Sequence, residues 1–281
     1  MKSFKSIRNR IDSIGSTKQI TKSMRLVSFA KAQKNKELLD EISNYYHANI
    51  ELMSMLSTHE GSKTNSFFSD NGGGNSAIVV ISTDRGLCSG YNSNIARTAA
   101  NLIKKTANPS IITVGSKIAA SFRRDNIPIR SRISGFSEYP IYEEAKLIAD
   151  LLMELYREKK IDEVLVVYTK FISMIEQKVI SQKLLPYETG DEKKNNGQWG
   201  CESGYSALVK KIIPDYLAST IYRAVVEAAL CEQSIRVSSM DAASKNADEL
   251  IEKLTLKYNQ ARQSSITSEI TEILNGSNAV D

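Results

Sequence analysis

The residues whose types and order could best form a reactive or ligand-binding site lie in one segment, Ser82–Asn92 (STDRGLCSGYN), between an apolar run and an expected helix. A loop that leaves a strand and opens a helix is where α/β proteins hold phosphate groups, on backbone N–H groups. The segment has neither G-x-G-x-x-G nor a closing Lys-Ser/Thr pair, so its support for a nucleotide site is weak. We favour a structured turn in which Asp84 pairs with Arg85, and Asn92 or Ser93 caps the helix.

Other reactive side chains are few and scattered. The protein has three cysteines and two histidines: Cys88, Cys201, Cys231, His47 and His59. Their spacing predicts neither a disulfide framework nor a zinc site, and it favours a reducing compartment. Because no histidine is close in sequence, Cys88 is expected to be a packed thiol rather than a nucleophile. The sequence therefore predicts no catalytic residue, no cofactor and no metal.

Charge is unevenly distributed along the 281 residues. The net charge is +5, but residues 1–36 contain ten Lys/Arg and one Asp, which gives +9. Residues 215–281 contain six Lys/Arg and ten Asp/Glu, which gives −4, so the remainder sums to zero. A basic N-terminal segment suits nucleic acid, lipid headgroups or an acidic protein surface. The charge distribution alone does not distinguish among these three kinds of partner.

Glycine and proline divide the chain into a middle and two ends. Of 14 glycines, 12 fall between Gly61 and Gly204, and four of the five prolines lie in that window. The ends are therefore expected to be helices, at residues 1–60 and 208–276. Their uninterrupted runs, roughly residues 2–57 and 215–275, would each be about 80–90 Å long at 1.5 Å per residue, too long to be buried in one globule.

Apolar and small residues at spacings of three and four predict the contact faces of these helices. On the N-terminal helix they are Ile7, Ile11, Ile14, Ile20, Met24, Val27, Leu38, Ile42, Tyr45, Leu52 and Leu56. On the C-terminal helix they are Leu217, Ile221, Ala224, Ala228, Cys231 and Ile235, then Met240, Ala243, Ala247, Leu250, Leu254, Tyr258, Ala261 and Ser265. The pattern predicts an antiparallel coiled-coil rod formed by the two ends of the chain.

The middle alternates between apolar runs and amphipathic segments. Strands are expected at 77–83, 110–115, 127–133, 163–168 and 176–185, and helices at 92–107, 117–125 and 141–160. Such alternation indicates a mostly parallel sheet covered on both faces. We therefore predict a Rossmann-like α/β domain over residues 75–190, inserted between the rod helices, with a surface loop at residues 191–207.

Three motifs, in order and at suitable separations, resemble the gamma subunits of F-type ATP synthases. They are IRNRI with TKQITKSM at 7–11 and 17–24, ISTDRGLC at 81–88, and YNQARQSSITSEITEI at 258–273. The resemblance extends over nearly the whole chain and includes the plan of two end helices around a central domain.

The resemblance implies a mechanical role. Gamma subunits form a rotating shaft inside a ring of three alpha and three beta subunits, and they are joined to epsilon and to the membrane c-ring. The shaft couples proton or sodium flow to ATP synthesis on the beta subunits. By resemblance, the subunit contacts are made by Lys18, Lys22, Met24, Arg25, Arg262, Gln263, Thr267 and Glu269. The expected location is peripheral, through the complex, on the cytoplasmic face of a bacterial plasma membrane, because the start resembles neither a signal nor a transit peptide.

Two other hypotheses remain open on the residues alone. A nucleotide-dependent enzyme would bind its ligand on residues 75–190. A coiled-coil nucleic-acid-binding protein would use the basic N-terminal helix, and its affinity would fall steeply with salt. The rotor hypothesis predicts neither kind of binding, and it requires a stoichiometric partner ring.

Overall fold

The computed structural model describes residues 2–59, 61–62, 65–69, 74–136, 139–188 and 204–277. The chain forms two compact units. The paired-helix unit comprises residues 1–29 and 236–281, and the α/β unit comprises residues 30–235. Both units draw on the same two long helices, α1 (Lys2–Thr58) and α5 (Tyr205–Ser277). Of the expected surface loop, residues 191–203 lie outside the described residues, and residues 205–207 belong to α5.

The α/β unit contains a five-stranded sheet in the order β3-β2-β1-β4-β5. Its strands are β1 (Asn75–Ile81), β2 (Asn108–Val114), β3 (Ser131–Ile133), β4 (Glu163–Phe171) and β5 (Gln177–Leu185). Pairing is parallel among the first four strands and antiparallel between β4 and β5. The helices are α2 (Tyr91–Lys105), α3 (Ser116–Arg124) and α4 (Tyr142–Arg157). A 3-2-1-4 parallel order is that of the Rossmann fold, so the predicted fold class is confirmed.

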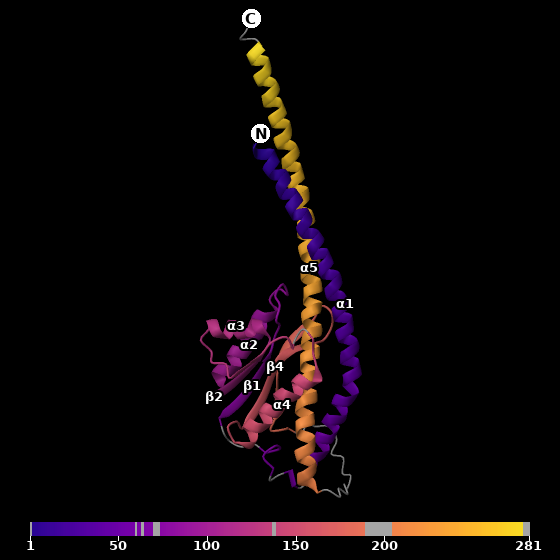
Figure 1. The fold of residues 1–281 in the computed structure, drawn as a ribbon, viewed down its shortest axis with the longest axis vertical. Helices are drawn as coiled ribbons and strands as arrows, with labels where there is room; N and C mark the ends of the chain where they lie inside the picture. The colour runs from indigo at the N-terminus through magenta and orange to yellow at the C-terminus, as the bar shows by residue number, and fades with distance from the viewer. Residues whose placement is uncertain are drawn as a thin grey trace. The chain divides into compact units, whose positions relative to one another are not determined.

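Alternation along the central strand β1 divides the core into two layers. Ala77, Val79 and Ile81 pack with α4, the end of α1 and the first part of α5. Ile78 and Val80 point to the other face, where α2 and α3 cover them (Figure 1). A parallel strand covered on both faces must be apolar on both, which explains the continuous run in the sequence.

A buried ion pair ties α5 to β4 and α1 within the α/β unit. The side chain of Glu227 is 3% exposed, and its Oε1 accepts a hydrogen bond from the backbone N–H of Phe171 at 3.0 Å. The Arg223 guanidinium lies 3.4 Å from Glu227 Oε2 and also sits over the ring of Tyr46, 4.6 Å from its centroid. Burial raises the pKa of the Glu227 carboxyl, and the Arg223 charge opposes that rise. The Glu227–Arg223 pair therefore connects three elements of the core.

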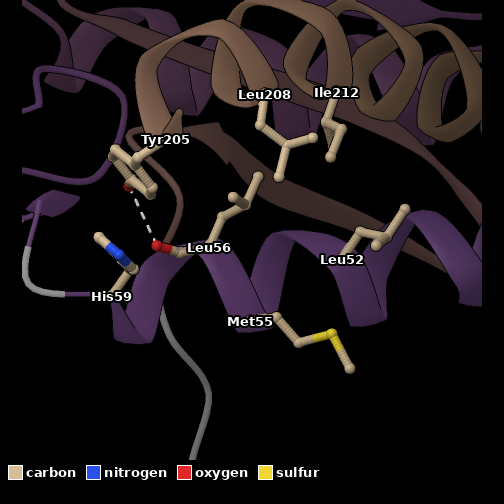
Figure 2. Close-up of a pocket in the computed structure, with 7 residues that line it drawn as sticks. All are labelled: Leu52, Met55, Leu56, His59, Tyr205, Leu208 and Ile212. Atoms are coloured by element: carbon tan, nitrogen blue, oxygen red, sulfur yellow. Dashed lines mark hydrogen bonds between the residues drawn. The ribbon is translucent and has the colours of Figure 1, made fainter. Parts of the chain in front are cut away.

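The end of α1 packs against the start of α5. The Tyr205 hydroxyl donates a hydrogen bond to the Leu56 carbonyl at 3.0 Å, and the His59 ring stacks on Tyr205 with centroids 4.4 Å apart (Figure 2). Beside them is a small apolar hollow of about 170 Å³. Its other lining residues are Leu52, Met55, Leu208 and Ile212. These contacts hold together the end of α1 and the start of α5, the two segments between which the sheet is inserted in the sequence.

Candidate functional surface on the paired helices

The predicted contact residues lie in the paired-helix unit, where α1 and α5 run antiparallel. The Phe4 ring meets the Tyr258 ring edge-on with centroids 6.2 Å apart. Further along α1, the hydroxyl oxygens of Thr21 and Ser244 lie 2.8 Å apart. Partner numbers on α5 fall as numbers on α1 rise, so the antiparallel pairing expected from the sequence is confirmed.

On α5 the contact face follows the predicted positions with one exception. Buried or half-buried are Met240, Ala243, Ala247, Leu254, Tyr258, Ala261 and Ser265. Leu250 was expected among them, but 49% of it is exposed, and the neighbouring Ile251 is half-buried instead. Alanine and serine dominate this face, and such small side chains allow two helix backbones to approach closely.

On α1 the prediction fails where the contact face becomes polar. Ile7, Ile11, Ile14 and Met24 are half-buried as expected, but Ile20 and Val27 are 60% and 57% exposed. Within the α/β unit, Tyr45 was also expected on the contact face and is 50% exposed. Lys18, Thr21, Arg25 and Ser28, at spacings of three and four, occupy the contact positions instead. The Thr21–Ser244 hydrogen bond and ion pairs to α5 make these polar residues suitable for the interface. A search for apolar periodicity alone misses such a face.

The four predicted contact residues of α1 differ in how far α5 engages them. Lys18 forms an ion pair with Asp248, and Arg25 lies 4.0 Å from Asp241, while both cations keep 38% of their side chains exposed. A hydrogen bond from Lys245, followed by the charges of Lys245 and Arg25, lowers the pKa of the Asp241 carboxyl. By contrast, Lys22 is exposed and Met24 is half-buried.

The four predicted contact residues of α5 all face solvent. Arg262, Gln263, Thr267 and Glu269 are exposed. Their local bonds stay within one helix turn: the Thr267 hydroxyl donates to the Gln263 carbonyl at 2.9 Å, and Glu269 lies 3.5 Å from the Ser265 hydroxyl. The outer polar atoms of this turn are therefore available to another molecule.

Exposed apolar side chains on both helices are a feature that the sequence prediction missed. They are Ile20, Leu26, Val27 and Phe29 on α1, and Leu250, Leu256, Ile266 and Ile270 on α5, each 44–60% exposed. Large exposed apolar surface usually marks a site of contact with another protein. The signal was present in the sequence, because several of these residues fall outside the three-and-four spacing of the contact faces.

The segment that resembled a phosphate loop is a structured turn. The two Asp84 carboxylate oxygens accept backbone N–H bonds from Ser116 and Gly135, each at 2.9 Å. Asn92 Oδ1 accepts the Ser82 hydroxyl at 2.7 Å, so its side chain serves the turn rather than a helix cap. The N-cap of α2 is Gly90, and no side chain caps it. The expected capping by Asn92 or Ser93 is therefore wrong, whereas Cys88 is buried as expected.

The residues that the structure describes contain neither a metal-binding cluster nor a membrane-spanning helix. In that part of the chain, no cluster of three or more His, Cys, Asp or Glu side chains is arranged to hold a metal ion. Nor does any helix there have the length and hydropathy needed to span a membrane.

Comparison with known proteins places the whole chain in one family. A family model described as ATP synthase matches residues 3–280. An ATP synthase gamma chain from Desulforamulus reducens is 36% identical over 283 residues and 100% of both chains. A sodium-ion-specific ATP synthase gamma chain from Acetobacterium woodii is 35% identical over 98% of both.

Solved structures agree on the fold. A chain of the Euglena gracilis mitochondrial ATP synthase, solved with OSCP, F1 and c-ring, matches with a TM-score of 0.72 at 18% identity, covering 99% of this chain and 94% of that one. A central stalk/c-ring chain from Tetrahymena thermophila matches with a TM-score of 0.65 at 23% identity, covering 80% of this chain and 99% of that one.

Proposed function

Because this chain belongs to the family of ATP synthase gamma chains, we propose that it is the rotating central-stalk subunit of an F1Fo ATP synthase. The observation that carries the proposal is the full-length relationship at 36% identity, together with the antiparallel helix pair. In this role the protein transmits torque from an ion-driven c-ring to catalytic beta subunits. The chain itself performs no chemistry, and the ATP sites belong to beta.

The surface of the paired helices suits a shaft that must turn inside a ring. A turning shaft makes contacts that are exchanged between equivalent partners, so no single contact can be very strong. Exposed cations such as Lys5, Arg8, Arg10 and Lys22 supply long-range attraction to carboxylates. The exposed apolar residues supply short-range contacts of moderate strength. Each orientation then favours a different conformation of each beta subunit, because the contacts differ from one orientation to the next.

The proposed contacts with alpha and beta comprise two sets. The first is Lys18, Lys22, Met24 and Arg25 on α1, and the second is Arg262, Gln263, Thr267 and Glu269 on α5. Exposure of Lys22 and of the whole second set supports direct contact. Lys18 and Arg25 have a further structural role, because they also pair with carboxylates of α5.

The remaining partners follow from the same role. We assign epsilon and the c-ring as partners, with the protein peripheral to the membrane through the complex. The proposed location is the cytoplasmic face of a bacterial plasma membrane. Either protons or sodium ions can drive such a machine, since the choice is made in the membrane ring.

Reconstitution tests the proposed function. The full chain is mixed with alpha and beta subunits from its own source, and particle mass and ATP hydrolysis are measured. We expect one copy of this chain per six-subunit ring and a marked gain in hydrolysis. A folded chain that neither joins the ring nor changes its activity would contradict the proposal. Salt-sensitive binding to duplex DNA in the same preparation would favour the nucleic-acid hypothesis instead.

Charge reversal on the exposed turn of α5 sharpens the test. Arg262→Glu removes a proposed contact and adds a repelling charge, whereas Lys257→Glu makes the same change at an exposed position outside the proposed set. We expect Arg262→Glu to lower the activity of the reconstituted ring several-fold more than Lys257→Glu does. Equal effects would remove Arg262 from the contact set.

A further inference from the structure

Three tyrosines from three helices come together within the α/β unit. Tyr45 lies on α1, Tyr142 opens α4, and Tyr222 lies on α5. The Tyr142 ring is almost perpendicular to both others: 76° to Tyr45 with centroids 6.3 Å apart, and 87° to Tyr222 at 5.6 Å. Both pairs are therefore edge-to-face contacts rather than stacks. We call Tyr45, Tyr142 and Tyr222, together with the hollow that they line, the tyrosine box.

The three tyrosines line an open hollow of about 350 Å³. Its lining is completed by Glu41, Ile42 and Ser219. This volume is within the range of roughly 300–1,000 Å³ typical of small-ligand sites. Half of Tyr45 is exposed, so a ligand can reach the rings from solvent.

Negative charge surrounds the tyrosine box. Burial raises the pKa of the Tyr222 hydroxyl, and the charges of Glu143 and Glu41 raise it further. Burial also raises the pKa of the Tyr142 hydroxyl, followed by its hydrogen bond with Tyr45 and by the charges of Tyr45, Asp215 and Glu143. No lysine or arginine is among the lining residues, and within the described residues neither Glu41 nor Glu143 takes part in an ion pair. The hollow thus combines aromatic walls with unbalanced carboxylates.

We propose that the tyrosine box binds an organic cation, an alkylammonium or guanidinium group seated among Tyr45, Tyr142 and Tyr222 and balanced by Glu41 and Glu143. Tyrosine faces attract such cations within about 6 Å of the ring centroid, and several faces around one ammonium group are the usual means of recognising it. The protein already uses this interaction nearby, where Arg223 lies over Tyr46. An anion would be repelled by the carboxylates, and an uncharged apolar ligand would leave them unbalanced.

The test compares a cation with its neutral isostere on the full chain. Choline and 3,3-dimethyl-1-butanol have the same shape, but only choline is charged. Each is titrated into the protein and followed by proton NMR, because methyl groups held over aromatic faces shift upfield. We expect saturable upfield shifts for choline and an affinity at least tenfold lower for the neutral isostere. Equal affinities, or no saturable shift with choline, would overturn the proposal.

Variants at exposed positions locate the site without risk to the fold. Tyr45→Leu removes one wall and should weaken choline binding about tenfold, and Glu41→Gln should weaken it several-fold. Tyr139→Leu and Glu51→Gln are matched controls on exposed residues that do not line the hollow, and they should leave binding unchanged. Unchanged affinity in Tyr45→Leu, with an unaltered circular dichroism spectrum, would show that choline binds elsewhere.

A last comparison identifies the source of the cation. The acetylated amides of lysine and arginine are titrated in parallel with choline. Tighter binding of either amide would identify the natural occupant as a basic side chain of another protein. Tighter binding of choline would identify a small quaternary ammonium solute.

Discussion

Replacing Glu227 by alanine should destabilise the α/β unit strongly. The carboxylate is almost fully buried, accepts the Phe171 N–H bond and faces the Arg223 guanidinium. Truncating it leaves a buried N–H group without its acceptor and a cation without its counter-charge. Breaking a buried pair from one side costs about 3–5 kcal/mol. Because 22% of the Arg223 side chain is exposed, water partly solvates the cation, and we expect a loss of about 3–4 kcal/mol.

Glutamine at the same position separates the hydrogen bond from the charge. Glu227→Gln keeps an oxygen that can accept the Phe171 N–H bond, so the loss should be smaller, about 1–2 kcal/mol. The two variants also differ from the wild type in their response to pH. The folded pKa of Glu227 is raised above the ordinary value of 4.5. Between pH 4.5 and the raised folded pKa, Glu227 in the folded state therefore retains a proton that it has released in the unfolded state.

The sign of the pH effect follows from this linkage. Where the folded state binds more protons, stability falls as pH rises. The Glu227 contribution is therefore most favourable below pH 4.5 and is lost as pH rises from there through the raised folded pKa. Glutamine cannot titrate, so Glu227→Gln should lack this part of the pH dependence.

Urea unfolding followed by tyrosine near-ultraviolet circular dichroism measures these effects. All twelve tyrosines except Tyr258 belong to the α/β unit, so the signal reports on that unit. Glu154→Ala, on the exposed face of α4, is the matched control and should change stability by less than about 0.5 kcal/mol. If Glu227→Ala cost no more than Glu154→Ala, the ion pair would not hold the core together as argued.

Three further predictions address the contact face, the turn and the thiols. Ile251→Ala should destabilise the helix pair by about 1 kcal/mol or more, and Leu250→Ala by less than half of that, as measured by helical circular dichroism during heating. A larger loss in Leu250→Ala would instead place Leu250 on the contact face, as the sequence predicted. Asp84→Ala should cost about 1–3 kcal/mol and speed amide exchange at the two N–H groups it holds, whereas unchanged exchange would contradict its role. Burial raises the pKa of the Cys231 thiol, so in a variant lacking Cys201 the folded protein should resist iodoacetamide at neutral pH and react once unfolded.

The sheet was predictable because its strands are apolar on both faces. The β1 run was expected at 77–83 and lies at Asn75–Ile81, and β2 and β4 begin within two residues of their expected starts. The same burial that stabilises these strands makes them continuous hydrophobic runs in the sequence. The third strand was expected at 127–133, but only Ser131–Ile133 pair with β2, since pairing depends on the partner strand as well as on composition.

The contact face of α1 was less predictable, because polar residues form part of it. Thr21 and Lys18 face α5 only by virtue of Ser244 and Asp248, which are more than 200 positions away in the sequence. Ile20 looked like a contact residue from its type, but it faces outward. Periodicity identifies a helix and the approximate side that packs, whereas the register between two helices depends on pairs that are distant in sequence.

The buried ion pair and the tyrosine box were not predicted at all. Glu227 and Phe171 are 56 positions apart, and the three tyrosines come from three separate helices. Such sites exist only once the sheet and both long helices have assembled. The proposed contact residues, in contrast, rest on sequence motifs, and the structure adds the exposure of Lys22 and of the four residues on α5.

Direct observation of rotation tests the central claim. A probe is attached through Lys105→Cys, at the exposed end of α2, in a chain whose Cys201 is replaced by serine, and the alpha–beta ring is fixed to glass. Cys88 and Cys231 are buried and should not be labelled. We predict that ATP makes the probe turn in one direction, pausing at three evenly spaced angles. A probe that stays still while the assembled ring hydrolyses ATP would contradict the proposed rotor function.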